Sequence, residues 1–304
     1  MHFSETSKGE LAILGEALLY SLFPVLTVFS YATLPPLVSL LFSTLFAVAF
    51  FGCLMLAGRK TRELRNKTVW KYIPIVTLFI SLLYYGLFFL GLSYTTANNG
   101  AIIGLMELFF SYLLFNVWRK ETFSAAQTAG AGLMLLGAVI ILFPKHGFGF
   151  HAGDWLILLA AASSPAGNYY QQKLRKIASS ETILFLRSLL ALPVFFCLSL
   201  LLKTHFVWSN IGRGLWFLAI NGLLLLGLSK QLWIEGIHRI SVTKANALSS
   251  IGPLFTLIFS YFILKQTPQL WQWLALLPII AGIALLTSKV KIKKAFTLWQ
   301  PIKT

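Results

Sequence analysis

Residues 104–143, GLMELFFSYLLFNVWRKETFSAAQTAGAGLMLLGAVIILF, align without a gap with residues 249–288, SSIGPLFTLIFSYFILKQTPQLWQWLALLPIIAGIALLTS. Both stretches carry bulky apolar residues in the same order, and Gly137 falls on Gly282 at this offset of 145. Self-similarity at one fixed offset is the signature of an internal repeat. The chain is therefore expected to contain two copies of one structural unit.

The match extends toward the N-terminus, where Gly9 and Glu10 fall on Gly153 and Asp154 at an offset of 144. Each copy holds five apolar stretches, and because five is odd, the second copy must enter the membrane from the opposite side. We expect an all-α polytopic membrane protein with ten transmembrane helices arranged as two inverted five-helix repeats. The repeats occupy residues 1–143 and 152–288, and a basic cytoplasmic tail follows at 289–304.

The composition supports this fold class. Of 304 residues, 57% are apolar and only 11% are charged, with a mean hydropathy of +0.77. A soluble domain carries about 25% charged residues, so this chain cannot cover itself with a wettable surface. Ten stretches have the length needed to cross a bilayer. They are residues 9–30, 36–57, 71–92, 97–117, 124–143, 153–173, 181–202, 213–236, 244–264 and 270–288.

The 25 basic and 9 acidic residues give a net charge of +16, which in a soluble protein would suggest a nucleic-acid partner. Here most basic residues lie in short loops, above all in GRKTRELRNKTVWK at residues 58–71, where they fix orientation. Nineteen of the 25 fall on the side of this loop. We therefore expect no nucleic-acid partner, both termini in the cytoplasm, and an integral protein of the bacterial inner membrane.

One pair of segments resembles a known family. Tyr94-Thr95-Thr96-Ala97 leads into the fourth span, which ends at Glu121, and residues 249–255 (SSIGPLF) occupy the counterpart in the ninth. With the ten-span plan, these segments resemble the EamA branch of the drug/metabolite transporter superfamily. The resemblance implies transport of amino acids, other small metabolites or amphiphilic drugs, often outward. One departure is Pro253, whose counterpart in the first repeat is Leu108.

Ionisable side chains inside the spans each need a reason, because insertion costs about 3 kcal/mol per group. Glu107 lies about ten residues into its helix, roughly 15 Å deep, which is the midplane where transporters of inverted-repeat design bind substrate. It could bind a proton or a cationic group of the substrate. The alternative is a structural glutamate hydrogen-bonded to a neighbouring helix.

Glu16, Arg187 and Lys230 share another depth, roughly 10 Å from the cytoplasmic face. Equal depth permits a charge cluster, which could gate the pathway, couple protons or bind an anionic substrate group, with Arg187 the stronger anion binder. The alternative is static helix packing with a snorkelling Lys230. Glu235 lies nearer the cytoplasm, so we expect a role at the mouth of the pathway.

Aromatic residues are the second class of candidates. Tyr84 and Tyr85 lie in the middle of the third span, too deep for the belt of interfacial aromatics. Together with Trp233 in the eighth span, they could line a small-molecule site. The alternative is a hydrogen bond to a neighbouring helix.

The sixth span contains Pro165 and Gly167, so we expect it to be kinked or locally opened. Pro24 predicts a comparable break in the first span. Interrupted helices in membranes are tolerated where backbone groups face a cavity or polar partners. The polar residues of the sixth span that could contact a substrate are Ser163, Ser164 and Asn168, and a packing kink with back-bonded serines is the alternative.

These features favour a secondary transporter of a small polar metabolite that works by alternating access, with the lipid bilayer as its solvent and protons as a candidate coupling ion. The mixture of Glu16 and Glu107 with Arg187 and Lys230 favours a zwitterion such as an amino acid, and export as the direction. Alternatives on the same fold are a flippase for a lipid-linked headgroup, a drug or cation exporter, and a binding or sensing protein. No motif of a pump or an enzyme is present in the sequence. We expect no cofactor, no metal and no catalytic residue, and a monomer or homodimer.

Overall fold

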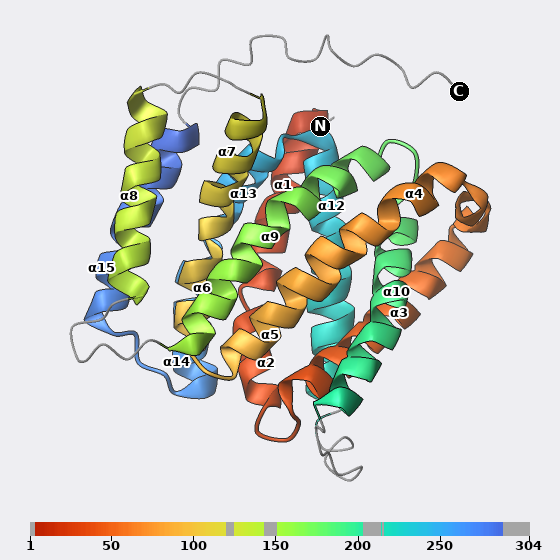
Figure 1. Cartoon of the computed structure of the whole chain (residues 1–304), viewed down its shortest axis with the longest axis horizontal. Coiled ribbons are helices and arrows are strands. Elements are labelled where there is room, and N and C mark those ends of the chain that lie inside the picture. Colours follow the sequence, from red (N-terminus) through yellow and green to blue (C-terminus); the bar gives the residue numbers. More distant parts are fainter. Residues whose placement is uncertain (1–3, 120–124, 143–150, 203–213, 215, 288–304) are drawn as a thin grey trace.

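The computed structural model describes residues 4–119, 125–142, 151–202, 214 and 216–287, and every regular element in this part is helical (Figure 1). Eight helices are long and apolar enough to cross a membrane. Two of the ten predicted spans, the sixth and the tenth, are not among these eight. The eight are Glu5–Ser30, Pro36–Ala57, Lys67–Leu92, Ala97–Leu114, Ala125–Leu142, Ser180–Leu201, Trp216–Arg239 and Lys244–Leu264.

The two remaining spans differ from the eight for separate reasons. Helix α15 (Leu270–Thr287) is apolar but contributes only a short stretch, Leu270–Leu286. Helix α9 (Ala152–Leu174) has 23 residues, about 35 Å at 1.5 Å per residue, so it is long enough but not apolar enough. Four of its polar side chains are buried in the protein, those of Asp154, Ser164, Asn168 and Gln171.

In the described residues, the first half of the chain contains eight α-helices, α1–α8 in Figure 1, and two further helical segments, η1 and η2. They are α1 (Glu5–Tyr20), α2 (Phe23–Ser30), α3 (Pro36–Ala57), η1 (Lys60–Arg65), α4 (Lys67–Val76), the π-helical segment η2 (Thr77–Tyr85), α5 (Gly86–Leu92), α6 (Ala97–Gly104), α7 (Met106–Arg119) and α8 (Ala125–Leu142). The second half follows α9 with α10 (Ser180–Leu201), the π-helical segment η3 (Asn221–Leu228), α12 (Ser229–Arg239), α13 (Val242–Ser249), α14 (Gly252–Leu264) and α15.

Equivalent helices of the two halves begin in the same way. Thr96 caps α6 by accepting a hydrogen bond from the backbone N–H of Asn99 at 3.1 Å. Ser241, its counterpart at the offset of 145, caps α13 by accepting from the N–H of Lys244 at 3.2 Å. Such caps satisfy N–H groups that the first helical turn leaves unpaired.

The predicted break in the first span is present, because α1 ends at Tyr20 and α2 begins at Phe23, one residue before Pro24. The predicted local opening at Pro165 is wrong. Helix α9 runs without a break through this proline, which removes only one backbone hydrogen bond. Close packing holds this part of α9, since a Cβ added to Gly167 would lie 2.4 Å from Ile80 Cγ1.

Paired interruptions occur elsewhere, at equivalent positions of the two halves. The π-helical segments η2 and η3 begin at Thr77 and Asn221, which are related by the offset of 144. The turn at Leu105 separates α6 from α7, and the turn at Ser250 and Ile251 separates α13 from α14. π-Helical turns are frequent at functional sites, so the residues on and around these helices are candidates for such a site.

Repeat-equivalent helices also pack against each other, α3 against α10 and α8 against α15, the latter pair at one edge of the molecule (Figure 1). A Cβ added to Gly130 would lie 2.7 Å from Gly282 O, and one added to Gly137 would lie 2.6 Å from Ala275 O. As the residue number rises along α8, from 130 to 137, the residue number of the contact on α15 falls from 282 to 275. The two equivalent helices are therefore antiparallel.

Candidate transport site

A cavity of about 120 Å³ lies among helices of both halves. Its wall comes from α1, α2, η2 and α5–α7 of the first half and from α9, α10 and α12–α14 of the second. Nine of the ten residues that the sequence analysis proposed for binding or gating line it. They are Glu16, Tyr84, Tyr85, Glu107, Ser164, Asn168, Arg187, Lys230 and Trp233.

Ser163, the tenth, does not line the cavity. Its hydroxyl donates to the backbone carbonyls of Ala160 at 2.7 Å and Phe79 at 3.2 Å. This is the back-bonded arrangement that was the alternative for the serines of this helix. Ser164, one residue further along, points instead to the polar side chains of the cavity.

Glu16 and Lys230 form an ion pair, with Lys230 Nζ 2.7 Å from Glu16 Oε1. The second carboxylate oxygen accepts a hydrogen bond from Ser249 Oγ at 3.0 Å. The ammonium also lies 3.1 Å from the centroid of the Tyr20 ring, a cation–π contact. Because the two side chains are only 2% and 10% exposed, the pair is a buried one that neutralises both charges.

Arg187 lies apart from this pair, so the structure divides the predicted three-charge cluster. Its Nη1 donates to Gln171 Oε1 at 2.7 Å, and its guanidinium carbon lies 5.8 Å from the centroid of the Tyr85 ring. The side chain is buried, and its Nε is a donor without a partner. Within the described residues, no acidic side chain forms an ion pair with Arg187.

Glu107 is held by an amide rather than by a cation. Asn168 Nδ2 donates to Glu107 Oε1 at 2.7 Å and to Ser164 Oγ at 2.9 Å. Asn168 Oδ1 in turn accepts from Gln171 Nε2 at 2.8 Å and from Trp233 Nε1 at 3.0 Å. In the described part of the chain, no basic side chain forms an ion pair with Glu107.

Gln171 is a central member of this group that the sequence analysis missed. A signal was present, because Ser164, Asn168 and Gln171 follow a spacing of four and then three residues, which places them on one face of a helix. Other lining residues that were not predicted include Tyr20, Asn246 and Ser249.

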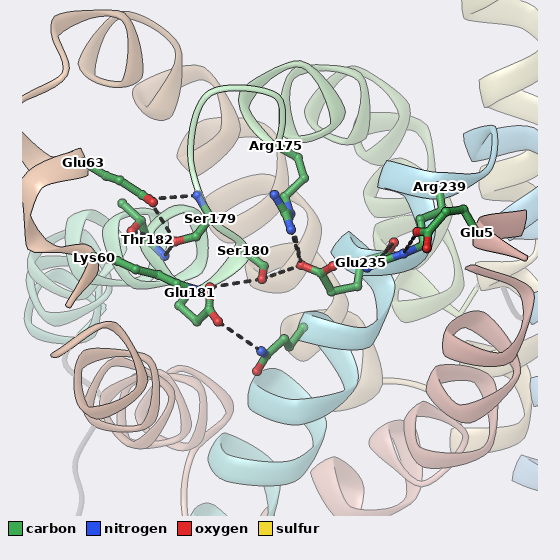
Figure 2. A network of polar contacts seen from close by, with 11 residues as sticks. Glu5, Lys60, Glu63, Arg175, Ser179, Ser180, Glu181, Thr182, Glu235 and Arg239 are labelled. Atoms are coloured by element: carbon green, nitrogen blue, oxygen red, sulfur yellow. Dashed lines mark hydrogen bonds and ion pairs between the residues drawn. The ribbon is translucent and has the colours of Figure 1, made fainter. Parts of the chain in front are cut away.

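Glu235, expected at the mouth of the pathway, does not line the cavity and belongs to a polar network at one end of the helices (Figure 2). One carboxylate oxygen accepts from Arg175 Nη2 and from Ser180 Oγ, both at 2.8 Å. The other accepts from Arg239 Nη1 at 2.6 Å, and Arg239 also bonds Glu5 at 3.1 Å. Through these contacts α1, α9, α10 and α12 are joined at this end.

The same network continues to the loop before α4 (Figure 2). Glu63 accepts from the backbone N–H and the hydroxyl of Ser179, the residue that precedes α10, at 2.8 and 2.9 Å. Lys60 forms an ion pair with Glu181 at 2.8 Å. The basic loop predicted to be cytoplasmic is thus tied to the start of α10.

A different polar cluster lies at the opposite end of α9. Asp154 accepts hydrogen bonds from Thr95 Oγ1 and from Asn99 Nδ2. Asn99 Oδ1 accepts from Gln272 Nε2 at 2.7 Å, and Gln272 Oε1 accepts from Asn98 Nδ2 at 3.4 Å. Asp154, Asn98, Asn99 and Gln272 are all at most 3% exposed.

The two ends are equivalent in sequence yet differ in packing. A Cβ added to Gly153 would lie 2.3 Å from Gly91 O, whereas one added to Gly9 would lie 3.5 Å from Gly236 O. Gly153 and Gly91 correspond to Gly9 and Gly236 at offsets of 144 and 145. The helices therefore approach each other more closely at the Asp154 end than at the Glu10 end.

The polar contacts differ in the same direction. Glu10 and Lys244 are the counterparts of Asp154 and Asn99, and they form an ion pair whose side chains are 35% and 46% exposed. Asp154 and Asn99 are buried. One end thus holds a buried hydrogen-bonded cluster and the other a partly exposed ion pair.

The described residues contain no group of three His, Cys, Asp or Glu side chains that could hold a metal ion. The chemistry that this part of the chain brings together is that of a small polar ligand: two carboxylates, two cations, amides, hydroxyls and aromatic rings around one cavity.

Comparisons with known proteins agree with this architecture. A sequence model of the EamA-like transporter family matches residues 7–143 and again residues 151–288. An uncharacterized transporter of Synechocystis sp. is 26% identical over 237 residues, which cover 74% of this chain and 67% of the relative. The uncharacterized transporter YyaM of Bacillus subtilis is 22% identical over 256 residues, 82% of each chain.

The chain is also similar to a protein of known crystal structure. The two superimpose with a TM-score of 0.68 over 93% of this chain and 98% of the other, at 19% sequence identity. At this identity the likeness concerns the fold. Together with the twofold match of the family model, it supports a two-repeat architecture over nearly the whole chain.

Proposed function

Because the chain belongs to the EamA-like transporter family, we propose that it is a secondary transporter that moves a small polar metabolite across the membrane by alternating access. The observation that carries this proposal is the central cavity, which both repeats line and which holds Glu16, Glu107, Arg187 and Lys230. Charged side chains inside the membrane cost free energy, and where they occur they mark substrate or ion pathways. Transporters built from repeats bind their substrate at the repeat interface.

The proposal includes ten spans in two inverted repeats, residues 1–143 and 152–288, with both termini and the tail 289–304 in the cytoplasm. Helix α9 counts as a span because its polar side chains are buried against protein and the cavity, where lipid does not reach them. The antiparallel contact of α8 with its equivalent α15 supports inversion, since repeats related by an axis along the membrane normal would place equivalent helices parallel.

The substrate that we favour is an amino acid or a related zwitterion, moved outward. Glu16 and Lys230 neutralise each other, which leaves Glu107 and Arg187 as one negative and one positive group without an ion-pair partner among the described residues. A zwitterion would complement both, whereas a cation or a lipid-linked anionic headgroup would complement one. Glu107 is also the group that we propose for proton coupling.

Alternating access requires that the two ends of the cavity open in turn. The difference between the ends supports this mode, because the Asp154 end is packed more closely than the equivalent Glu10 end. We propose that this conformation is closed toward the outside. Rocking of the repeats would loosen the Asp154 cluster and close the cytoplasmic end in exchange.

The test is uptake by the purified full-length chain in proteoliposomes, with and without a pH gradient, after a thermal-shift screen of amino acids and other metabolites has identified a ligand. Glu107→Gln is expected to abolish transport or to remove its dependence on the pH gradient, because the neutral amide cannot carry a proton. Glu10→Gln, which changes a partly exposed carboxylate outside the cavity, is the matched control. Normal, gradient-dependent transport by the Glu107→Gln protein would remove this residue from the mechanism.

A further inference from the structure

A chain of hydrogen bonds joins the two charged groups of the cavity that lack ion-pair partners. Arg187 Nη1 donates to Gln171 Oε1, Gln171 Nε2 donates to Asn168 Oδ1, and Asn168 Nδ2 donates to Glu107 Oε1, at 2.7, 2.8 and 2.7 Å. All three bonds run in one direction, from the guanidinium to the carboxylate. We call these four residues the amide relay.

The direction of the relay is fixed by chemistry. A guanidinium can only donate and a carboxylate can only accept, so each intervening amide must accept with its oxygen and donate with its nitrogen. Trp233 Nε1, which can only donate, also bonds Asn168 Oδ1 at 3.0 Å and holds that amide in the same orientation. The relay therefore orients Arg187 and Glu107 relative to each other.

Each end of the relay retains binding capacity. Arg187 Nε has no partner although the side chain is 3% exposed, and a buried donor without an acceptor costs free energy. Asn168 donates to Oε1 of Glu107, and within the described residues no cation lies at ion-pair distance from this carboxylate. Both residues line the same cavity.

We propose that the relay recognises the head group of an α-amino acid, with the substrate carboxylate on Arg187 and the substrate ammonium on Glu107, and that Gln171 is a positioning residue. This inference rests on the proposed transport function and specifies its binding site. An arginine suits the carboxylate because it offers several N–H donors in one plane. The side chain of the substrate would lie against Ile80, Phe88 and Leu105, apolar residues of the same cavity wall.

Glu16 and Lys230 have a different role in this scheme. Their mutual ion pair, the bond from Ser249 and the contact with Tyr20 provide partners for both groups, so neither charge is left uncompensated. Gln171 holds Arg187 without neutralising it, because a glutamine oxygen accepts a hydrogen bond but carries no charge. A carboxylate at this position would occupy the guanidinium permanently.

The experiment measures binding to the full-length chain in nanodiscs, by thermal shift and then calorimetry. The twenty amino acids are the first probes. For the tightest binder, the affinity is compared with that of its decarboxylated amine. We expect the wild-type protein to bind the amino acid at least about tenfold more tightly than the amine, which corresponds to about 1.4 kcal/mol.

Three variants then test which residues produce the preference for the amino acid over the amine. Gln171→Glu supplies Arg187 with an internal carboxylate, and Arg187→Met removes the cation, so in each the amine should bind at least as well as the amino acid. Gln172→Glu adds the same charge one residue further along α9. It removes the hydrogen bond that Gln172 Nε2 donates to the Ile237 carbonyl at 2.7 Å, which should lower stability but preserve the wild-type ratio. The ratio of two affinities is unaffected by a general loss of stability, and two independent variants guard against one that does not fold.

Three results would overturn the inference: no amino acid binds, the wild-type protein binds the amine as tightly as the amino acid, or Gln171→Glu and Gln172→Glu behave alike. Counterflow of the same amino acid in proteoliposomes separates this inference from the proposed function. Binding with the expected ratios but without counterflow would refute transport and leave recognition intact. Counterflow without a preference for the amino acid over the amine would refute recognition by the relay and leave transport intact.

Discussion

Gly153→Ala should open the end of the molecule that Asp154 closes. The added Cβ would lie 2.3 Å from Gly91 O and 2.8 Å from the carbonyl carbon of Tyr94. Real Cβ atoms essentially never come within 3.0 Å of another heavy atom, so the start of α9 would have to move away by at least 0.7 Å, the difference between 3.0 and 2.3 Å. Backbone atoms cannot rotate aside as a flexible side chain can.

The free-energy cost follows from this clash. Overpacking of this kind costs about 1–3 kcal/mol in the conformation that contains the close contact. A conformation in which the two helices have separated does not bear that cost. The equilibrium between the two should therefore shift toward the form open at the Asp154 end by about 5- to 150-fold.

Cysteine labelling can measure this shift. Cys53 and Cys197 are free and exposed, so both are first replaced by serine, and Ala101→Cys places a reporter in the cavity wall. A membrane-impermeant thiol reagent is then added to sealed vesicles of each orientation. Gly153→Ala should accelerate labelling from the Asp154 side by about fivefold or more, in proportion to the population of the open form.

Gly9→Ala is the matched control at the equivalent position. Its Cβ would lie 2.9 Å from Arg239 Cβ, so it requires a displacement of only 0.1 Å, from 2.9 to 3.0 Å, and little change in labelling is expected. An unchanged rate for Gly153→Ala, or equal acceleration by both variants, would show that the close approach at Gly153 does not hold this end closed.

Two further predictions concern stability, measured as thermal unfolding of the protein in nanodiscs. Lys230→Met leaves the Glu16 carboxylate buried without its cation and should destabilise the protein by about 3–5 kcal/mol, whereas Lys230→Met combined with Glu16→Gln should recover a large part of this loss. A double variant no more stable than the single one would contradict this. Gly137→Val would bring a Cβ within 2.6 Å of Ala275 O and should cost about 1–3 kcal/mol, while Gly132→Val, which meets nothing within 4 Å, should be neutral; equal effects would refute close packing of α8 on α15.

The arrangement of the helices along the chain could be predicted well, because apolar length is a property of local sequence. The predicted span 36–57 has the same bounds as α3, Pro36–Ala57. Helix α9 is the exception, because its hydropathy alone does not identify it as a span. Helix α9 was predicted at 153–173 and lies at Ala152–Leu174, but its buried polar residues lower its hydropathy below that of the eight apolar spans.

The candidate cavity could be predicted in composition but not in its contacts. Rise along a helix gives the depth of a side chain, and depth correctly selected Glu16 and Lys230 as neighbours. Depth says nothing about direction around the helix axis or about the partners that a neighbouring helix supplies. For that reason Arg187, at a similar predicted depth, was expected beside Glu16 and instead bonds Gln171.

The helix interruptions were the least predictable feature. Proline is a local signal, and it located the break before Pro24 but not an opening at Pro165. The π-helical segments have no such signal, because tertiary packing determines them. In η3, for example, a Cβ added to Gly222 would lie 2.4 Å from Ser43 O, so the backbone of α3 directly abuts this segment.

The two π-helical segments also have a consequence for the spacing of residues along the chain. A π turn closes its hydrogen bond one residue later than an α turn, so every residue beyond it is rotated by about 100° relative to an uninterrupted α-helix. Lys230 lies two residues beyond Leu228, the end of η3, and Tyr84 and Tyr85 are the last residues of η2. The phase of these helices, and hence which residues face the cavity, is set by the number of residues in the segment as much as by their identity. Loss of a single residue from η3 would therefore rotate Lys230 and Trp233 by about 100° relative to the cavity that they line, whereas most substitutions at the same position would leave their direction unchanged.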